Sequence, residues 1–276
     1  MTDLTPFAPH ADAPPRAIGQ MRLSTKRHAG RTVLDTLYQK GASKVVFPRS
    51  PLGCTGVMLN TSGGVTGGDR FENEAVAGAG THLCLTTQAC ERAYRAFPGQ
   101  VGRIRTVLRV EDGATLWWLP QETLLFDGCD LDRRLSCDLA PGARALIVEP
   151  VCFGRIAMGE TRVTGRVSDR IAINQCGAPL VMDGWELTGD MTAQLAHKAV
   201  GSGAAAMVSL TYVAPDAERH LDPLRDLLPP AGGASLLAEN TLVMRLLAPT
   251  GFELRRSLLP ILDHLTGGHL PLCWRL

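Results

Sequence analysis

The segment AGTHLCLTTQ at residues 79–88 decides the fold class, because its plan returns three more times along the chain. Each copy has a glycine near its start, then two or three small or polar residues, then a β-rich apolar run that ends near a proline or a polar residue. The other copies are KGASKVVFPR at 40–49, DGATLWWLPQ at 112–121 and PGARALIVEP at 141–150. A unit repeated every 30 residues or so is typical of stacked β architectures.

The spacing of these repeats is informative. Their glycines are separated by 39, 33 and 29 residues and are Gly41, Gly80, Gly113 and Gly142. Each is preceded by another β candidate, at residues 32–37, 71–77, 104–110 and 131–139. Because the intervals are irregular, we expect no perfect solenoid. The sequence predicts a mainly β fold, with a distorted β-helical or stacked β-sheet architecture.

The second half of the chain keeps the β character and adds about two peripheral helices. Further strands are predicted at 161–167, 170–174, 180–187, 206–213 and 241–247. Leucines at helical spacing predict a helix over 220–228, which Pro229 and Pro230 end. A second apolar stripe predicts a helix over 252–265, kinked or restarted at Pro260. The segment PPAGGAS at 229–235 is predicted to be a loop.

Length and composition favour a single domain. We expect a disordered tail over residues 1–20, which are rich in proline and alanine, and one β-rich domain over 21–276. The start of the chain lacks the apolar core of a signal peptide, and no apolar run is long enough to cross a bilayer. We therefore expect a cytoplasmic protein whose eight cysteines are reduced.

The charge balance says little about partners. A net charge of +1 gives no reason to expect nucleic acid or a membrane surface as a ligand. Charged residues make up 20% of the chain, below the usual quarter. This low content has two explanations that remain open: a composition rich in glycine and alanine, or a surface that partner proteins cover.

The glycine-rich loop at 59–70, LNTSGGVTGGDR, does not match a nucleotide site. Its glycine pairs, Gly63-Gly64 and Gly67-Gly68, lack the spacing of a dinucleotide fingerprint, and no lysine follows as in a phosphate loop. Ser62 has no nucleophile elbow around it, and Cys90 is best explained as a small core residue. The sequence therefore indicates no catalytic residues.

Metal ligands are the remaining chemistry to consider. His82 and Cys84 fall on one face of a predicted strand, but two residues do not make a metal site, and a structural role is favoured. Four acidic residues stand beside glycines or at strand ends, where oxygen ligands could hold a cation weakly: Asp69, Glu149, Glu160 and Asp183. The alternative for each is that it caps a turn or pairs with a nearby arginine, Asp69 with Arg70 and Glu149 with Arg155.

Four segments, in order, resemble the UreD (UreH) family of urease accessory proteins. They are NTSGGVTGGDR with GAGTHLCLTTQA, then LPQETLLFDGCDL at 119–131, EPVCFGRIAMGE at 149–160 and the closing PLCWRL at 271–276. The resemblance runs from about residue 22 to the end of the chain. The sequence departs from commoner members at Ser62 and at cysteines such as Cys84 and Cys90.

The resemblance implies a scaffold rather than an enzyme. Members dock on apo-urease, recruit a UreF-type protein and, through it, a UreG-type GTPase, and support lysine carbamylation and Ni²⁺ delivery to the dinuclear site. By this analogy the four acids are candidates to line a transient nickel passage, which the loop glycines Gly63, Gly64, Gly67 and Gly68 would shape. No tightly bound cofactor is expected, only transient Ni²⁺.

Two other functions remain open from the residues alone. One is a hydrolase or lyase on a stacked β fold, for which the grouping of Asp69, Arg70 and Glu72 is only a hint. The other is a purely structural adaptor without a metal path. Association with urease subunits would separate the scaffold from the enzyme, and nickel dependence would separate it from the adaptor.

Overall fold

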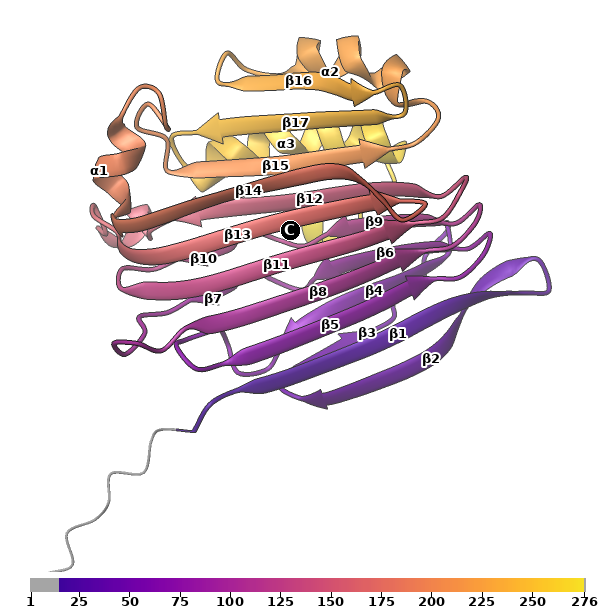
Figure 1. Ribbon diagram of the computed structural model, residues 1–276, viewed down its shortest axis with the longest axis horizontal. Helices are drawn as coiled ribbons and strands as arrows, with labels where there is room; N and C mark the ends of the chain where they lie inside the picture. Colours follow the sequence, from indigo (N-terminus) through magenta and orange to yellow (C-terminus); the bar gives the residue numbers. More distant parts are fainter. Residues whose placement is uncertain (1–14, 276) are drawn as a thin grey trace, which may run out of the picture.

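Two β-sheets face each other in the computed structural model, which describes residues 15–275 (Figure 1). The seven-stranded sheet has the order β14 (Ala178–Asp190), β13 (Thr164–Gln175), β11 (Cys129–Leu139), β8 (Gly102–Val110), β5 (Arg70–Ala77), β1 (Ile18–His28) and β2 (Arg31–Gly41). The ten-stranded sheet has the main order β16 (Gly232–Ala238), β17 (Thr241–Ala248), β15 (Ala206–Val213), β12 (Arg144–Phe153), β9 (Thr115–Leu119), β6 (His82–Thr87), β4 (Cys54–Asn60) and β3 (Ser43–Val46). Two short strands complete it, β7 (Glu91–Ala93) and β10 (Thr123–Leu125).

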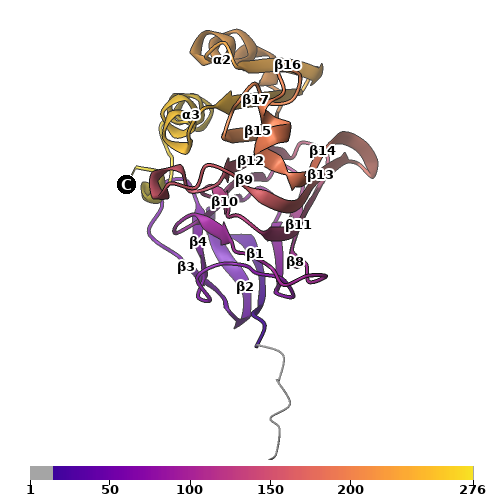
Figure 2. The ribbon, with the colours of Figure 1, turned by 90° about the vertical axis from the view of Figure 1, so that its left-hand side faces the viewer.

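The centre of the molecule is a β-solenoid of about 4 turns. From β4 to β13 the long strands alternate between the two sheets, and neighbours within each sheet run parallel. The antiparallel strands β2 and β14 flank one sheet, and β15 to β17 extend the other (Figure 2). The prediction of a mainly β, distorted β-helical fold is confirmed.

The repeated glycines occupy equivalent turns of the solenoid. Gly80, Gly113 and Gly142 each lie in the turn that leads from the seven-stranded sheet to the ten-stranded sheet, with φ of 64°, 63° and 70°. Positive φ of this kind favours glycine. Successive turns also stack directly, since the Gly80 N–H donates to the Asp112 carbonyl at 2.9 Å. One repeat of the sequence, from one of these glycines to the next, therefore passes through both sheets and is one full turn of the solenoid.

Burial explains why strands of the two sheets look different in sequence. Strand β11 alternates buried and exposed positions, because one face of the seven-stranded sheet is open to solvent. In strand β12 every residue after Arg144 is buried. There the inner face packs in the intersheet core and the outer face packs under α3 (Gly251–Thr266), as Figure 2 shows.

Both predicted helices are present. They are α2 (Leu221–Leu227) and α3, which continues through Pro260 as one helix and begins at the cap Thr250. A shorter helix, α1 (Met191–Ala196), was not predicted; Asp190 caps it by accepting from the Ala193 N–H. The predicted loop at 229–235 is shorter than expected, because β16 begins at Gly232 and pairs with β17.

The N-terminal boundary also shifts. Strand β1 begins at Ile18, three residues before the predicted start of the domain, and lies parallel to β5. Residues 1–14 of the predicted tail, and residue 276, lie outside the described residues. The two strands predicted at 161–167 and 170–174 are one continuous strand, β13.

Candidate functional site

The first candidate acid, Asp69, holds the glycine-rich loop in place. Its carboxylate is buried and accepts backbone N–H groups from Ala17 and Thr66, both at 2.8 Å. These bonds join the residue before β1 to the loop that precedes β5. Asp69 therefore caps a turn by accepting backbone N–H groups. Within residues 15–275 it forms no ion pair with Arg70, which the sequence predicted as its partner.

The loop glycines are needed for close packing. A side chain at Gly64 would collide with the Tyr94 ring, and one at Gly67 would lie 2.6 Å from the Gln100 carbonyl oxygen. The Tyr94 hydroxyl donates to the Gly63 carbonyl at 3.1 Å, and Val65 pairs with the end of β7. The glycine pairs thus let β7 and the segment after it, as far as Gln100, approach the loop. The notion that they shape a nickel passage stays a prediction.

The second candidate, Glu149, belongs to a charge network buried between the two sheets. Arg133 on β11 donates to Asp169 on the neighbouring β13 through Nε at 3.0 Å and Nη2 at 2.6 Å. Its Nη1 lies 2.6 Å from Glu149 Oε2 on β12, so the arginine bridges the sheets. All three charged side chains are less than a tenth exposed.

One neutral donor, Trp118, and one neutral acceptor, Thr123, complete this network. The Trp118 indole N–H donates to Glu149 Oε1 at 2.7 Å, and Arg133 Nη1 donates to the Thr123 hydroxyl at 2.9 Å. Burial raises the pKa of Glu149, and Arg133 opposes that rise. Burial likewise opposes the charge on Arg133, but Asp169 and Glu149 outweigh it and raise the arginine pKa. The network carries two carboxylates and one guanidinium.

The remaining candidates, Glu160 and Asp183, lie away from this network. Glu160 accepts the backbone N–H groups of Asp127 at 3.1 Å and Arg155 at 2.8 Å, and it pairs with the Arg155 side chain. Asp183 on β14 pairs with Arg245 on β17 at 2.5 Å. Arg155 is therefore the partner of Glu160, whereas the sequence analysis assigned it to Glu149; Arg133 occupies that place.

The four acids do not meet at one site. Within residues 15–275, no group of three or more His, Cys, Asp or Glu side chains is arranged to hold a metal ion. Each acid instead has a structural partner. A role in nickel transfer for Asp69, Glu149, Glu160 and Asp183 stays a prediction. Sequence reasoning missed Arg133 and Asp169, although both stand at core-facing positions between apolar residues of the same strand face.

The other residues singled out in the sequence are packed in place. The His82 ring meets Trp117 edge-on at 4.4 Å, and burial, with His269 nearby, lowers the His82 pKa to about 4. Cys84 is buried. Burial, with Glu122 beside it, raises the pKa of the Cys90 thiol to about 12, which disfavours the thiolate that a nucleophile needs.

Replacing Glu160 with glutamine tests its structural role. Arg155 and the two backbone donors outweigh burial and lower the pKa of Glu160, so its stabilisation is present above the ordinary carboxyl pKa and is lost as pH falls. We expect Glu160→Gln to lower the free energy of unfolding by about 0.5–2 kcal/mol at pH 7. In urea unfolding this difference should narrow toward pH 4, while Glu239→Gln, at an exposed position, should change little at either pH. A pH-independent difference would contradict the charged role.

The fold and the site define a β-solenoid scaffold with an apolar core between its sheets and one buried charge network that bridges them. The model of the UreD urease accessory protein family matches residues 17–275. A urease accessory protein UreD of Ruegeria pomeroyi is 51% identical over 92% of this chain and 99% of its own length. Proteins of the same description from Roseobacter denitrificans and Rhizobium etli are 50% and 42% identical, over 95% and 96% of this chain and 96% and 98% of their own lengths. The chain belongs to the UreD family.

Family membership confirms the predicted class of function. The chain is a urease accessory protein involved in maturation of the urease nickel site, and such proteins are non-catalytic scaffolds. Within residues 15–275, helices long and apolar enough to cross a bilayer do not occur.

Proposed function

We propose that this protein docks on apo-urease, recruits a UreF-type protein and through it a UreG-type GTPase, and supports lysine carbamylation and Ni²⁺ delivery to urease in the cytoplasm. The observation that carries the proposal is identity of about half the residues to urease accessory proteins over nearly the whole chain. Deletion of the gene for this protein from a urease-producing cell should leave the urease protein present but inactive. Activity should return when the gene is restored.

The buried network supports placing a cation route near Glu149. Its two carboxylates face one guanidinium in the space between the sheets, and an excess of negative charge in a region of low dielectric attracts cations. Ni²⁺ is cargo in this proposal and not a resident cofactor. Asp69, Glu160 and Asp183 are weaker candidates, because each lies outside this network and has no second carboxylate among its described partners.

Glu149→Gln is the sharpest test of the nickel role. The glutamine keeps an acceptor for Trp118, and the Arg133–Asp169 pair remains, so we expect the fold and binding of apo-urease to be retained. If Glu149 supplies an oxygen ligand, the nickel concentration for half-maximal urease activation should rise about tenfold. Excess nickel should then restore part of the activity.

Asp69→Asn is the matched control, since it removes a charge of the same sign at a turn cap. Asparagine keeps only one of the two side-chain oxygens that accept the Ala17 and Thr66 backbone N–H groups, and this loss should lower the free energy of unfolding by about 0.5–2 kcal/mol. Assembly and activation should then fall together, without rescue by nickel. Normal activation at limiting nickel in Glu149→Gln, with normal pull-down of apo-urease, would exclude Glu149 from the route and favour a structural adaptor.

A further inference from the structure

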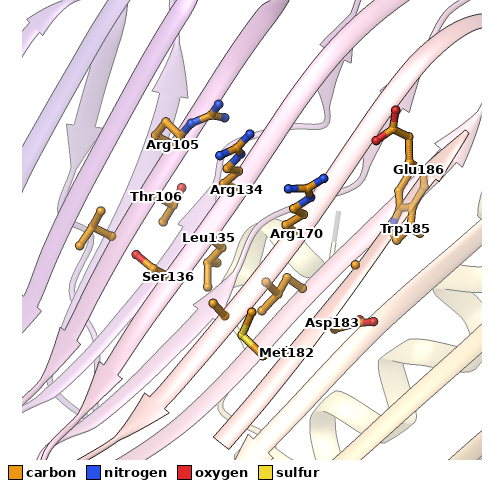
Figure 3. A pocket seen from close by; sticks show the side chains of 14 residues that line it. Arg105, Thr106, Arg134, Leu135, Ser136, Arg170, Met182, Asp183, Trp185 and Glu186 are labelled. Atoms are coloured by element: carbon orange, nitrogen blue, oxygen red, sulfur yellow. The ribbon is translucent and has the colours of Figure 1, made fainter. Parts of the chain in front are cut away.

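A row of three arginines crosses the open face of the seven-stranded sheet. Arg105 on β8, Arg134 on β11 and Arg170 on β13 are register partners on neighbouring parallel strands. Figure 3 shows the three guanidinium groups side by side. Like charges placed directly opposite one another destabilise a sheet. Stability of the fold therefore does not explain the row.

The carboxylates near the row do not neutralise it. Asp132 serves both Arg105, at 2.8 Å, and Arg134, at 3.2 Å. Asp183 and Glu186, at the rim, pair with Arg245 and Arg166. Arg105 and Arg134 thus share one ion-paired carboxylate, that of Asp132, and Glu72 on β5 is the register neighbour of Arg105 at the other end of the row. Within the described residues Arg170 has no ion-pair partner, and it is exposed.

These arginines line an open groove with an apolar side. The groove has a volume of about 750 Å³, and besides the arginines it is lined by apolar residues such as Val107, Ile171 and Met182. Met182 is 74% exposed on the edge strand β14. A second hollow of about 260 Å³, between β14 and strands β15 to β17, shares Met182 and Asp183 with the first. The two hollows therefore lie on either side of the β14 edge at Met182 and Asp183.

We propose that this arginine groove docks an acidic segment of a protein partner, in which Asp or Glu side chains meet the arginine row and an apolar residue packs on Met182. Arginine forks bind carboxylates in a bidentate manner, and a partly apolar groove adds burial. The inference rests on the proposed scaffold function and specifies which face serves one of its protein contacts.

Arg170→Glu tests the groove with the least disturbance of the fold, because Arg170 forms no ion pair within residues 15–275. The matched control is Arg109→Glu, also exposed on β8 of the same sheet but outside the groove. Binding of each variant to purified apo-urease and to a purified UreF-type protein would be measured at low and physiological salt. For one of these partners we expect Arg170→Glu to weaken binding about tenfold or more, with a reduced salt dependence, and Arg109→Glu to weaken it less than about twofold.

A photo-crosslinker placed at Met182 identifies the bound segment. The crosslinked peptide should be rich in Asp and Glu; a basic or uncharged peptide would contradict the proposal.

The binding measurements separate the groove from the scaffold role. If Arg170→Glu and the double variant Arg134→Glu/Arg170→Glu bind both proteins with unchanged affinity, the proposed docking groove is wrong, but the scaffold function is not affected. A wild-type chain that binds neither protein would contradict the scaffold role and, with it, the proposed occupant. An oligonucleotide bound more tightly than either protein, with the same dependence on Arg170, would assign the groove to nucleic acid instead.

Discussion

Replacing Arg133 with methionine is expected to lower the free energy of unfolding by about 3–5 kcal/mol, because it leaves two buried carboxylates without a counter-charge. Arg133 is the only side chain in the network described here that contacts both Glu149 and Asp169, at 2.6 Å each. Methionine has a similar length, so the loss of charge dominates over the loss of volume. Urea unfolding followed by fluorescence or circular dichroism measures the change.

The neighbouring arginine provides a control on the same strand. Arg134 points to the opposite face of β11, its side chain is 52% exposed, and it pairs with Asp132. Exposed ion pairs contribute at most about 1 kcal/mol. Arg134→Met should therefore cost far less than Arg133→Met, and equal losses would contradict the importance of the buried network.

The effect of pH separates loss of charge from loss of packing. Burial already raises the pKa of Glu149, and removal of Arg133 takes away the group that opposes this rise. A carboxyl whose pKa is raised in the folded state stabilises the fold below its unfolded pKa and loses that contribution as pH rises. The defect of Arg133→Met should be smaller at pH 5 than at pH 8.

Neutralising all three charged residues of the network should restore most of the free energy of unfolding that Arg133→Met loses. In the triple variant Arg133→Met/Glu149→Gln/Asp169→Asn no buried charge is left unpaired, and such replacements are often neutral. A triple variant as unstable as Arg133→Met would indicate that packing, not charge, causes the loss.

Local signals in the sequence predicted the elements of the fold well. A glycine that needs positive φ, followed by an apolar run, predicts the turn and strand at Gly80, Gly113 and Gly142. The two-faced burial of β12 appears directly as an apolar run that only Glu149 interrupts. Strand pairing is different, because register depends on contacts between residues far apart in the chain. The short strands β7 and β10 form only through such contacts, and the sequence around them has no strand periodicity.

The charge network was missed for a related reason, although a signal existed. Arg133 follows the alternation of Leu131 and Leu135 and so falls on the core side of β11. Asp169 stands in the same way between Val167 and Ile171 on β13. A charged residue at a core-facing position predicts a buried partner, but the identity of that partner depends on which strands become neighbours.

The closing segment of the chain contributes a second buried anchor. Trp274 is fully buried, and its indole N–H donates to the Leu119 carbonyl at 3.0 Å. The Arg255 guanidinium lies 5.0 Å from the centre of the Trp274 indole ring and also binds Glu122 at 2.9 Å. The segments LPQET and PLCWRL, far apart in the chain, therefore meet through α3. Through these contacts, Trp274 holds α3 against the ten-stranded sheet.

Trp274→Ala should accordingly lower the free energy of unfolding by about 3–5 kcal/mol, the usual cost of a large cavity in a core. Trp274→Phe keeps most of the ring but removes the N–H donor, and we expect a loss of about 1–3 kcal/mol from the unpaired Leu119 carbonyl. Leu272, two residues away and 74% exposed, supplies the control: Leu272→Ala should change stability by less than about 0.5 kcal/mol. Equal urea midpoints for Trp274→Ala and the unmodified chain would mean that the closing segment does not anchor α3. In that case helix α3 must be held to the ten-stranded sheet by its leucine face alone.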